Sequence, residues 1–251
     1  MMTMHKPKYK RVLYVSDIHA PFHDNKAINA MIAFAGWFKP DVVIYMGDLV
    51  DFYAISHFAK DPKRALQLQK EIDSAVSVLT RIDTACNGAE KFFLRGNHEM
   101  RMQKFLWTRA SELSSLRGLS VEKLLKLEKF GIKYMKNGRL NYRGNVIKHG
   151  DIVRKFSAYT AKGEFDATGM SGKSAHTHRA GVYRVTNESG SYTWMECGCL
   201  CKLNAEYMDG KVPNWQQGFG ISYFKEGSRR FHDEFVTIIK GKAMYGGMEF
   251  Y

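Results

Sequence analysis

The chain has 251 residues, of which 45% are hydrophobic, and this composition excludes both a collagen-like and a disordered protein. The hydrophobic content is sufficient for one large packed core, so we expect a single domain over residues 1–251. The N-terminal segment has no apolar stretch suited to a signal peptide, and no run is long enough to span a bilayer. The sequence therefore favours a cytoplasmic protein without a membrane partner.

The charge of the chain is strongly basic, because 38 Lys and Arg residues against 25 Asp and Glu residues give a formal net charge of +13. An excess of this size favours a polyanionic partner, although a solvated basic surface is also common. Only Glu122 and Glu128 oppose the eight cationic residues between positions 121 and 149, which are Lys123, Lys126, Lys129, Lys133, Lys136, Arg139, Arg143 and Lys148. Nucleic acid is therefore the expected partner, and the oligomeric state stays open.

The first half of the chain alternates short apolar segments with longer amphipathic ones. Arg11–Ser16, Asp41–Met46 and Lys91–Leu94 are predicted strands. Apolar residues recur at helical spacing between these strands, at Ile28, Met31, Ile32 and Ala35 and then at Ala65, Leu68, Ile72, Ala75, Val76 and Leu79. This alternation predicts parallel strands joined by crossover helices, and hence an α/β sheet.

The second half is expected to begin with a basic helical insertion at about residues 100–130, interrupted by Gly118. Its first helix has an apolar side formed by Met102, Phe105, Leu106 and Trp107. Turn residues then occur at 137–138, 143–145, 187–190 and 225–227, and each group is typical of a β-hairpin. A second sheet in the same domain is the simplest interpretation.

Polar side chains follow each of the three early strands at the point where the strand ends. The three segments are Asp17-Ile18-His19, Gly47-Asp48-Leu49-Val50-Asp51 and Gly96-Asn97-His98-Glu99. The carboxyl ends of parallel strands lie at one edge of a sheet, so these groups can converge. Asp17 and His19 are two positions apart and would project the same way if the chain stayed extended.

Three more histidines follow later in the chain: His149 before Gly150, and His176 and His178 two positions apart. The candidate ligands are together Asp17, His19, Asp48, Asn97, His149, His176 and His178. Carboxylate, amide and imidazole groups without thiolate suit manganese, iron, zinc and similar divalent ions. The set is too large for one tetrahedral site, but it suffices for two metals if Asp48 bridges them.

The cysteines are not expected to be metal ligands. Cys197, Cys199 and Cys201 alternate, so in a strand they would share one face. A thiolate metal site would need a second Cys or His pair at zinc-finger spacing, and the sequence has no such pair. A strand edge or a packed core is the expected role.

The order of the polar segments resembles the calcineurin-like metallophosphoesterase family, whose pattern is D-x-H, G-D-x-x-D, G-N-H-[DE], H and G-H-x-H. All five segments are present between Asp17 and His178, with Ala175 where the family has glycine. The resemblance implies a four-layer α/β/β/α sandwich of two mixed sheets. Within this family, the chain is similar to the small stand-alone phosphoesterases of the nuclease and phosphodiesterase branch.

The resemblance also implies the ligand sets and the catalytic groups. One divalent metal would be held by Asp17, His19, Asp48 and His178, and the second by Asp48, Asn97, His149 and His176. Manganese is the expected metal, with iron, zinc, nickel or cobalt as alternatives. A metal-bridging hydroxide would be the nucleophile, His98 the general acid, and Asp51 the residue that orients the His98 ring.

The function implied is two-metal hydrolysis of phosphate esters, with nucleic acid as the favoured substrate of a phosphodiesterase, nuclease or nucleic-acid phosphatase. Candidate substrate contacts are Arg101, Lys104, Arg154 and Lys173. Phe52 argues against a phosphoprotein substrate, since protein serine/threonine phosphatases carry a phosphate-binding arginine there. Two alternatives stay open: a phosphomonoesterase acting on phosphoprotein or small-molecule phosphate, and a non-catalytic nucleic-acid-binding protein. DNA or RNA, and exo or endo action, are not specified.

Overall fold

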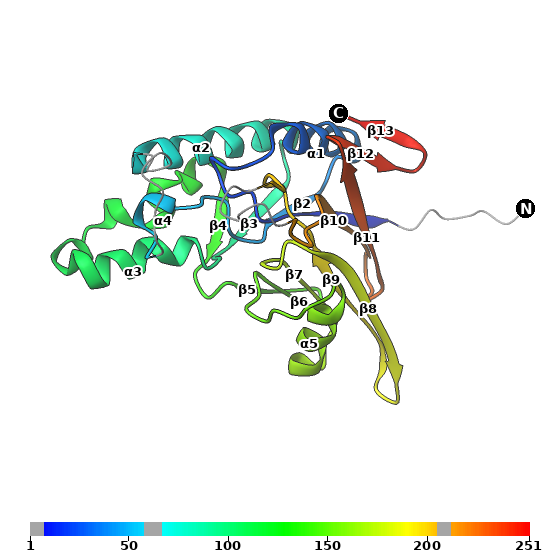
Figure 1. The fold of residues 1–251 in the computed structure, drawn as a ribbon. Coiled ribbons are helices and arrows are strands. Elements are labelled where there is room, and N and C mark those ends of the chain that lie inside the picture. The colour runs from blue at the N-terminus through cyan, green and yellow to red at the C-terminus, as the bar shows by residue number, and fades with distance from the viewer. Residues whose placement is uncertain (1–7, 58–66, 205–211) are drawn as a thin grey trace, which may run out of the picture.

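Two β-sheets form the centre of the molecule (Figure 1). The computed structural model describes residues 8–57, 67–204 and 212–251, so the predicted helical position Ala65 lies outside the described residues. The larger sheet has eight strands in the order β13-β12-β11-β10-β1-β2-β3-β4, and the smaller has five in the order β5-β6-β7-β9-β8. Within the described residues, no helix is both long and apolar enough to cross a membrane.

The larger sheet contains β1 (Tyr9–Val15), β2 (Val42–Tyr45), β3 (Glu90–Leu94), β4 (Ile132–Met135), β10 (Gly218–Lys225), β11 (Phe231–Ile239), β12 (Lys242–Tyr245) and β13 (Met248–Phe250). The smaller contains β5 (Arg139–Tyr142), β6 (Asn145–Lys148), β7 (Gly172–Ser174), β8 (Ala180–Asn187) and β9 (Gly190–Cys197). The α-helices are α1 (Asn25–Phe38), α2 (Leu68–Ala85), α3 (Glu99–Arg109), α4 (Val121–Leu124) and α5 (Tyr159–Thr168). Short 3₁₀ helices span Tyr53–Ile55, Ser111–Leu113, Arg117–Leu119 and Leu127–Phe130.

The first four strands are parallel, and α1 and α2 are the crossovers between β1, β2 and β3. This part of the prediction is confirmed. The strands β10 to β13 pair antiparallel at the other end, so the larger sheet is mixed. The helices α1 and α2 cover one face of this sheet, the smaller sheet covers the other, and α5 lies beyond the smaller sheet (Figure 1). The expected α/β/β/α order is therefore observed.

Alternate residues of β1 explain why the layers form. Leu13 and Val15 pack in the cluster that α1 and α2 complete, whereas Val12 and Tyr14 pack between the two sheets. Successive strand residues point to opposite faces, so a strand buried on both sides needs an uninterrupted apolar sequence. The loops that leave such a strand are the first positions where polar side chains can be placed.

One predicted hairpin is wrong. The Asn137–Gly138 turn connects β4 to β5, which belong to different sheets, and it lies beside Arg95, the residue that follows β3. Gly138 has a φ of 67°, and a Cβ there would lie 2.7 Å from the carbonyl oxygen of Arg95. The other three turns form the hairpins β5–β6, β8–β9 and β10–β11 as expected.

Residues 99–130 connect β3 to β4 and are helical, as expected, but they do not form one long helix. Only α3 exceeds four residues, and the remainder consists of α4 and three short 3₁₀ helices. Met102 and Leu106 are buried beneath α3, whereas Trp107 is exposed and therefore does not belong to the packed side of the helix.

The prediction that Lys173 contacts substrate is wrong, because its side chain is completely buried between the sheets. Its Nζ lies 3.0 Å from Oδ1 of Asp233 and donates a hydrogen bond of 2.7 Å to Oδ1 of Asn145. The centroid of the Phe231 ring lies 4.3 Å from Lys173 Nζ. Lys173 thus joins the two sheets through a buried, paired charge.

Candidate metal centre

The candidate ligands all lie in loops that follow strands. Asp17 and His19 follow β1, Asp48 follows β2 and Asn97 follows β3. The smaller sheet contributes the other three, with His149 after β6 and His176 and His178 after β7. The structure brings all seven side chains together.

The first group has an unsatisfied carboxylate oxygen at its centre. Oδ1 of Asp17 is buried and has no hydrogen-bond partner among the described residues. It lies 3.4 Å from Nε2 of His178 and 3.8 Å from Nε2 of His19, and these two nitrogens are 3.0 Å apart. Imidazole nitrogens and a carboxylate oxygen that face one small space fit a divalent cation.

The second group is built around Asn97. Its Oδ1 lies 2.8 Å from Nε2 of His149 and 2.8 Å from Nδ1 of His176. Oδ2 of Asp48 is 3.3 Å from Nε2 of His149 and also 3.8 Å from Nε2 of His19 in the first group. Asp48 thus adjoins both groups, which fits a carboxylate shared by two ions.

Each of the two aspartates divides its oxygens between the protein and the site. Oδ2 of Asp17 accepts the backbone N–H of His176 at 3.1 Å, while Oδ1 faces the imidazoles. Oδ1 of Asp48 accepts the backbone N–H of His98 at 2.9 Å, while Oδ2 faces the imidazoles. The hydrogen bonds fix both carboxylates so that one oxygen of each points at the site.

The backbone of the ligand loops is left-handed at five ligand positions. These residues are Asp17, His19, Asp48, His176 and His178, with φ between 48° and 70°. The chain does not stay extended through Asp17 and His19, and the two side chains converge through left-handed turns instead. Asp and His adopt this region more readily than most residues, although it remains costly. Ala175 has no positive φ, so its methyl group is accommodated in the core between the sheets.

Glu99 holds two of these loops together. Its buried carboxylate accepts the backbone N–H groups of Asp48, Leu49 and Gly96, each at 2.9 Å. Burial, together with the nearby Asp48 carboxylate, raises the pKa of Glu99 to about 7. A Cβ on Gly96 would collide with the Asp48 carboxylate, so the loops can approach only at glycine. This role of Glu99 is not evident from the sequence, where its signal is the acidic residue that closes the G-N-H-E segment.

His98 adjoins both Asp51 and Arg101. Its Nδ1 donates to the backbone carbonyl of Asp51 at 2.8 Å, and its Nε2 accepts from Arg101 at 3.1 Å. Burial lowers the pKa of His98 to about 4, although the Asp48 carboxylate favours the charged ring. The Asp51 carboxylate lies closer to His19 Nδ1, at 3.1 Å, than to His98 Nδ1, at 3.4 Å. The Asp51 carbonyl rather than its carboxylate therefore makes the hydrogen bond that orients His98.

The remaining candidate substrate contacts differ in position. Arg101 is 16% exposed and forms an ion pair of 3.0 Å with Asp51, so it belongs to the site itself. Lys104 is exposed one turn further along α3. Arg154 is exposed on the loop between β6 and α5, where its carbonyl oxygen accepts a hydrogen bond from Arg179.

The cysteines are all buried and free. Cys197 packs between the two sheets, and Sγ of Cys201 lies 3.7 Å from Nδ1 of His178. A hydrogen bond with Cys199, together with burial, raises the pKa of the Cys201 thiol well above its usual value. Cys201 therefore supports the back of the His178 ring as a neutral thiol, a contact that the sequence did not reveal.

Residues 10–196 match the family model of the calcineurin-like phosphoesterases. The chain belongs to this family. It is accordingly a metal-dependent phosphoester hydrolase, and the seven-ligand geometry fits that assignment.

Two curated relatives cover almost the whole chain. The chain is 28% identical over 250 residues to the gene 54 protein of Mycobacterium phage D29, covering 95% of this chain and 97% of the relative. Its identity to the gene 54 protein of Mycobacterium phage L5 is 28% over 254 residues, with the same coverage. Among solved structures, Vacuolar Protein Sorting 29 from Cryptosporidium parvum has a TM-score of 0.50 at 10% identity, covering 96% of this chain and 98% of that chain. This last likeness shows the fold.

Replacing Asp48 by Asn should remove bound metal and hydrolysis together, because Asp48 adjoins both ligand groups. Metal content by elemental analysis and turnover of a small phosphodiester measure the two effects. Asp73→Asn on the exposed side of α2 is the matched control and should change neither. An Asp48→Asn protein that retained both metals and normal turnover would refute the shared-ligand assignment.

Metal binding should release protons near neutral pH. Burial disfavours charge on both rings, but the Asp48 carboxylate raises the pKa of His149 to about 9, and the Cys201 contact and the Asp17 carboxylate raise the pKa of His178 to about 9. A protonated ring cannot bind a cation, so binding must displace a proton from each, and metal affinity should rise with pH until about 9. Calorimetric titration with Mn²⁺ in buffers of different ionisation enthalpy measures this release. Binding heats that did not depend on the buffer would contradict it.

Proposed function

We propose that the protein hydrolyses phosphodiester bonds of nucleic acid at this centre. The observation that carries the proposal is a cleft of about 430 Å³ that adjoins Asn97 and His149 and is lined by Arg95 and Arg139. Within the described part of the chain, neither arginine side chain forms an ion pair. Unneutralised guanidinium groups beside a metal centre favour phosphate, which they bind with two parallel hydrogen bonds.

A further cation lies next to the catalytic histidine. Arg101 adjoins His98, whereas Arg95 and Arg139 line the cleft beside Asn97. A substrate with one phosphate needs only one of these positions, while a polymer with a phosphate at every nucleotide can use both. The net charge of +13 agrees with a polyanionic substrate.

The residues of the chain have separable tasks in this reaction. Divalent ions, when bound, supply an activated water and neutralise phosphate charge, and the oxygen and nitrogen ligands suit manganese. The Asp51 carbonyl accepts from Nδ1 of His98, so Nε2 is the atom that would take up a proton from solvent and pass it to the leaving oxygen. Phosphate is a stronger acceptor for Arg101 than a neutral imidazole, so substrate would draw Arg101 away from Nε2.

The two alternatives receive less support. A phosphoprotein phosphatase would use the residue after G-D-x-x-D to hold phosphate, but Phe52 is completely buried in the core. A non-catalytic role is suggested by the fold likeness to a protein named for vacuolar sorting. This chain, however, has every expected ligand in contact and a histidine next to Asn97, which favours catalysis.

A substrate panel with Mn²⁺ tests the proposal. The panel contains single-stranded DNA, duplex DNA, RNA, bis-p-nitrophenyl phosphate and p-nitrophenyl phosphate. Cleavage of at least one polymer and of the diester, with slower hydrolysis of the monoester, is the expected result. Hydrolysis of the monoester alone would support the phosphomonoesterase instead, and polymer binding without hydrolysis of any compound would support the non-catalytic role.

His98→Ala should retain both metals and lose activity selectively. For alkyl leaving groups, which need a proton, the loss should be roughly 10²- to 10⁴-fold in kcat, and for nitrophenolate it should be much smaller. The rates with the two classes of ester are compared on metal-loaded protein, and His232→Ala, at an exposed position of β11, is the control. Equal losses for both leaving groups would remove His98 from the general-acid role.

A further inference from the structure

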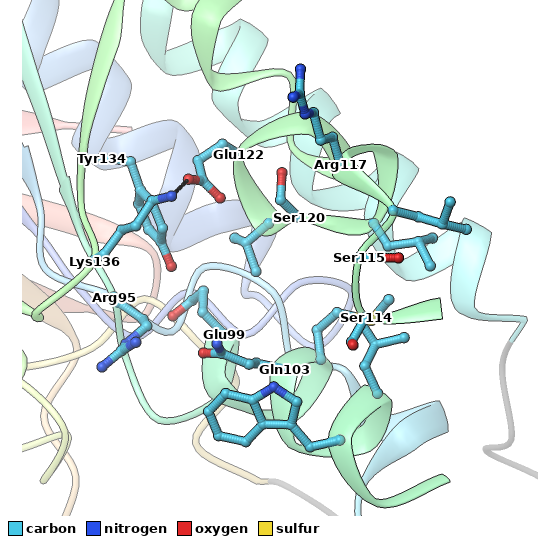
Figure 2. A pocket seen from close by; sticks show the side chains of 16 residues that line it. Arg95, Glu99, Gln103, Ser114, Ser115, Arg117, Ser120, Glu122, Tyr134 and Lys136 are labelled. Carbon is cyan, nitrogen blue, oxygen red and sulfur yellow. Dashed lines mark ion pairs between the residues drawn. The ribbon is translucent and has the colours of Figure 1, made fainter. Parts of the chain in front are cut away.

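A second cavity, of about 310 Å³, lies between α3, β4 and residues 114–122 (Figure 2). It is distinct from the cleft at the metal centre, and none of the seven metal ligands lines it. Cavities of this size hold small molecules or parts of larger ones. The groups on its walls indicate which chemistry it would accept.

The walls combine an aromatic surface with uncommitted polar groups. Trp107 lines the cavity and is 57% exposed, which is unusual for so large an apolar side chain. Gln103, Ser115 and Ser120 also line it, and among the described residues their side chains form no hydrogen bond with protein groups. Figure 2 shows Ser120 across the cavity from Gln103 and Glu99. An indole for stacking, with an amide and hydroxyls for edge contacts, is the chemistry that recognises a nucleobase.

The charges around the cavity favour an anionic ligand. Glu122 is neutralised by Lys136 at 2.8 Å, as the dashed line in Figure 2 marks, and the Glu99 carboxylate is occupied by three backbone N–H groups. Arg95 and Arg117 have no ion-pair partner in the part of the chain that the structure describes, and both line the cavity. A base carried by a phosphate backbone satisfies both the aromatic and the cationic features.

The cavity and the metal-centre cleft are adjacent. The Arg95 side chain lines both of them. The chain that leaves β4 also borders both, because Tyr134 and Lys136 line the cavity while Asn137 and Arg139 line the cleft. A strand whose phosphates lie along Arg139 and Arg95 would therefore pass from the cleft to the edge of the cavity.

We propose that this second cavity binds one unstacked nucleobase of the nucleic acid that is cleaved at the metal centre. The inference rests on the proposed function and adds a recognition site to it. A base can enter the cavity only when it leaves its stack, so the enzyme favours single-stranded over duplex substrate. Trp107 is the specificity-determining residue, and it lies outside the catalytic machinery.

An abasic scan tests the site. The substrates are single-stranded oligonucleotides with one cleavable phosphodiester, phosphorothioates elsewhere, and a single abasic nucleotide moved along the strand. With the wild-type protein, kcat/KM should fall at one position relative to the cleavable bond, by roughly 5- to 150-fold, the range that stacking of one base supplies. Trp107→Ala should show the same loss with the intact strand and no dependence on the abasic position.

Control variants and a second substrate separate this result from general damage. Trp107→Phe retains an aromatic face and should retain the position dependence, and Trp37→Ala, at an exposed tryptophan of α1, should behave as wild type. Hydrolysis of bis-p-nitrophenyl phosphate should be unchanged in all three variants, because the metal centre is intact.

The outcomes distinguish the inference from the function on which it rests. Cleavage of the strand without dependence on the abasic position, or a Trp107→Ala variant that responds as wild type does, would overturn the base site and leave the nuclease function standing. Hydrolysis of the small diester without cleavage of any strand would overturn the nucleic-acid function and with it the base site.

Discussion

The backbone conformation of the ligand loops is the constraint on which the metal centre depends. Five of the seven ligand residues have positive φ, a conformation that costs on the order of 1–3 kcal/mol at a strained position. Hydrogen bonds hold the loops in this conformation, because the buried Glu99 carboxylate accepts three of their backbone N–H groups. Asp17 and Asp48 each accept one further backbone N–H group. The same carboxylates then have one oxygen left for a cation. Holding the loops and binding the metal are therefore tasks of a single hydrogen-bond network.

The helix α3 joins three features that the chain otherwise keeps apart. Glu99 at its first position anchors the ligand loops, and Arg101 two positions later reaches Asp51 and His98. Gln103 and Trp107, four residues apart, share the helix side that lines the second cavity. One short helix thus contributes to the ligand loops, to the surroundings of His98 and to the second cavity.

Charge is used in two opposite ways in this fold. Lys173 and Asp233 are paired between the sheets, where each compensates the cost of burying the other and neither is available to a ligand. Arg95 and Arg139 line the cleft without an ion pair in the described residues, where water or a phosphate can solvate them. The basic character of the sequence thus divides into a structural part and a part that faces substrate.

The motifs of the sequence were sufficient to indicate the α/β class, the parallel start of the larger sheet and the candidate ligands from Asp17 to His178. These features are local, because apolar runs give strands and polar residues at strand ends give loops. The sequence could not show that Lys173 is buried, since the partner that neutralises it is Asp233, sixty residues away. Nor could it show that Asn137–Gly138 joins two sheets, or that Cys201 lies against His178. Only the tertiary structure decides such contacts, because they depend on how the two sheets pack and on which chain segments that packing brings together.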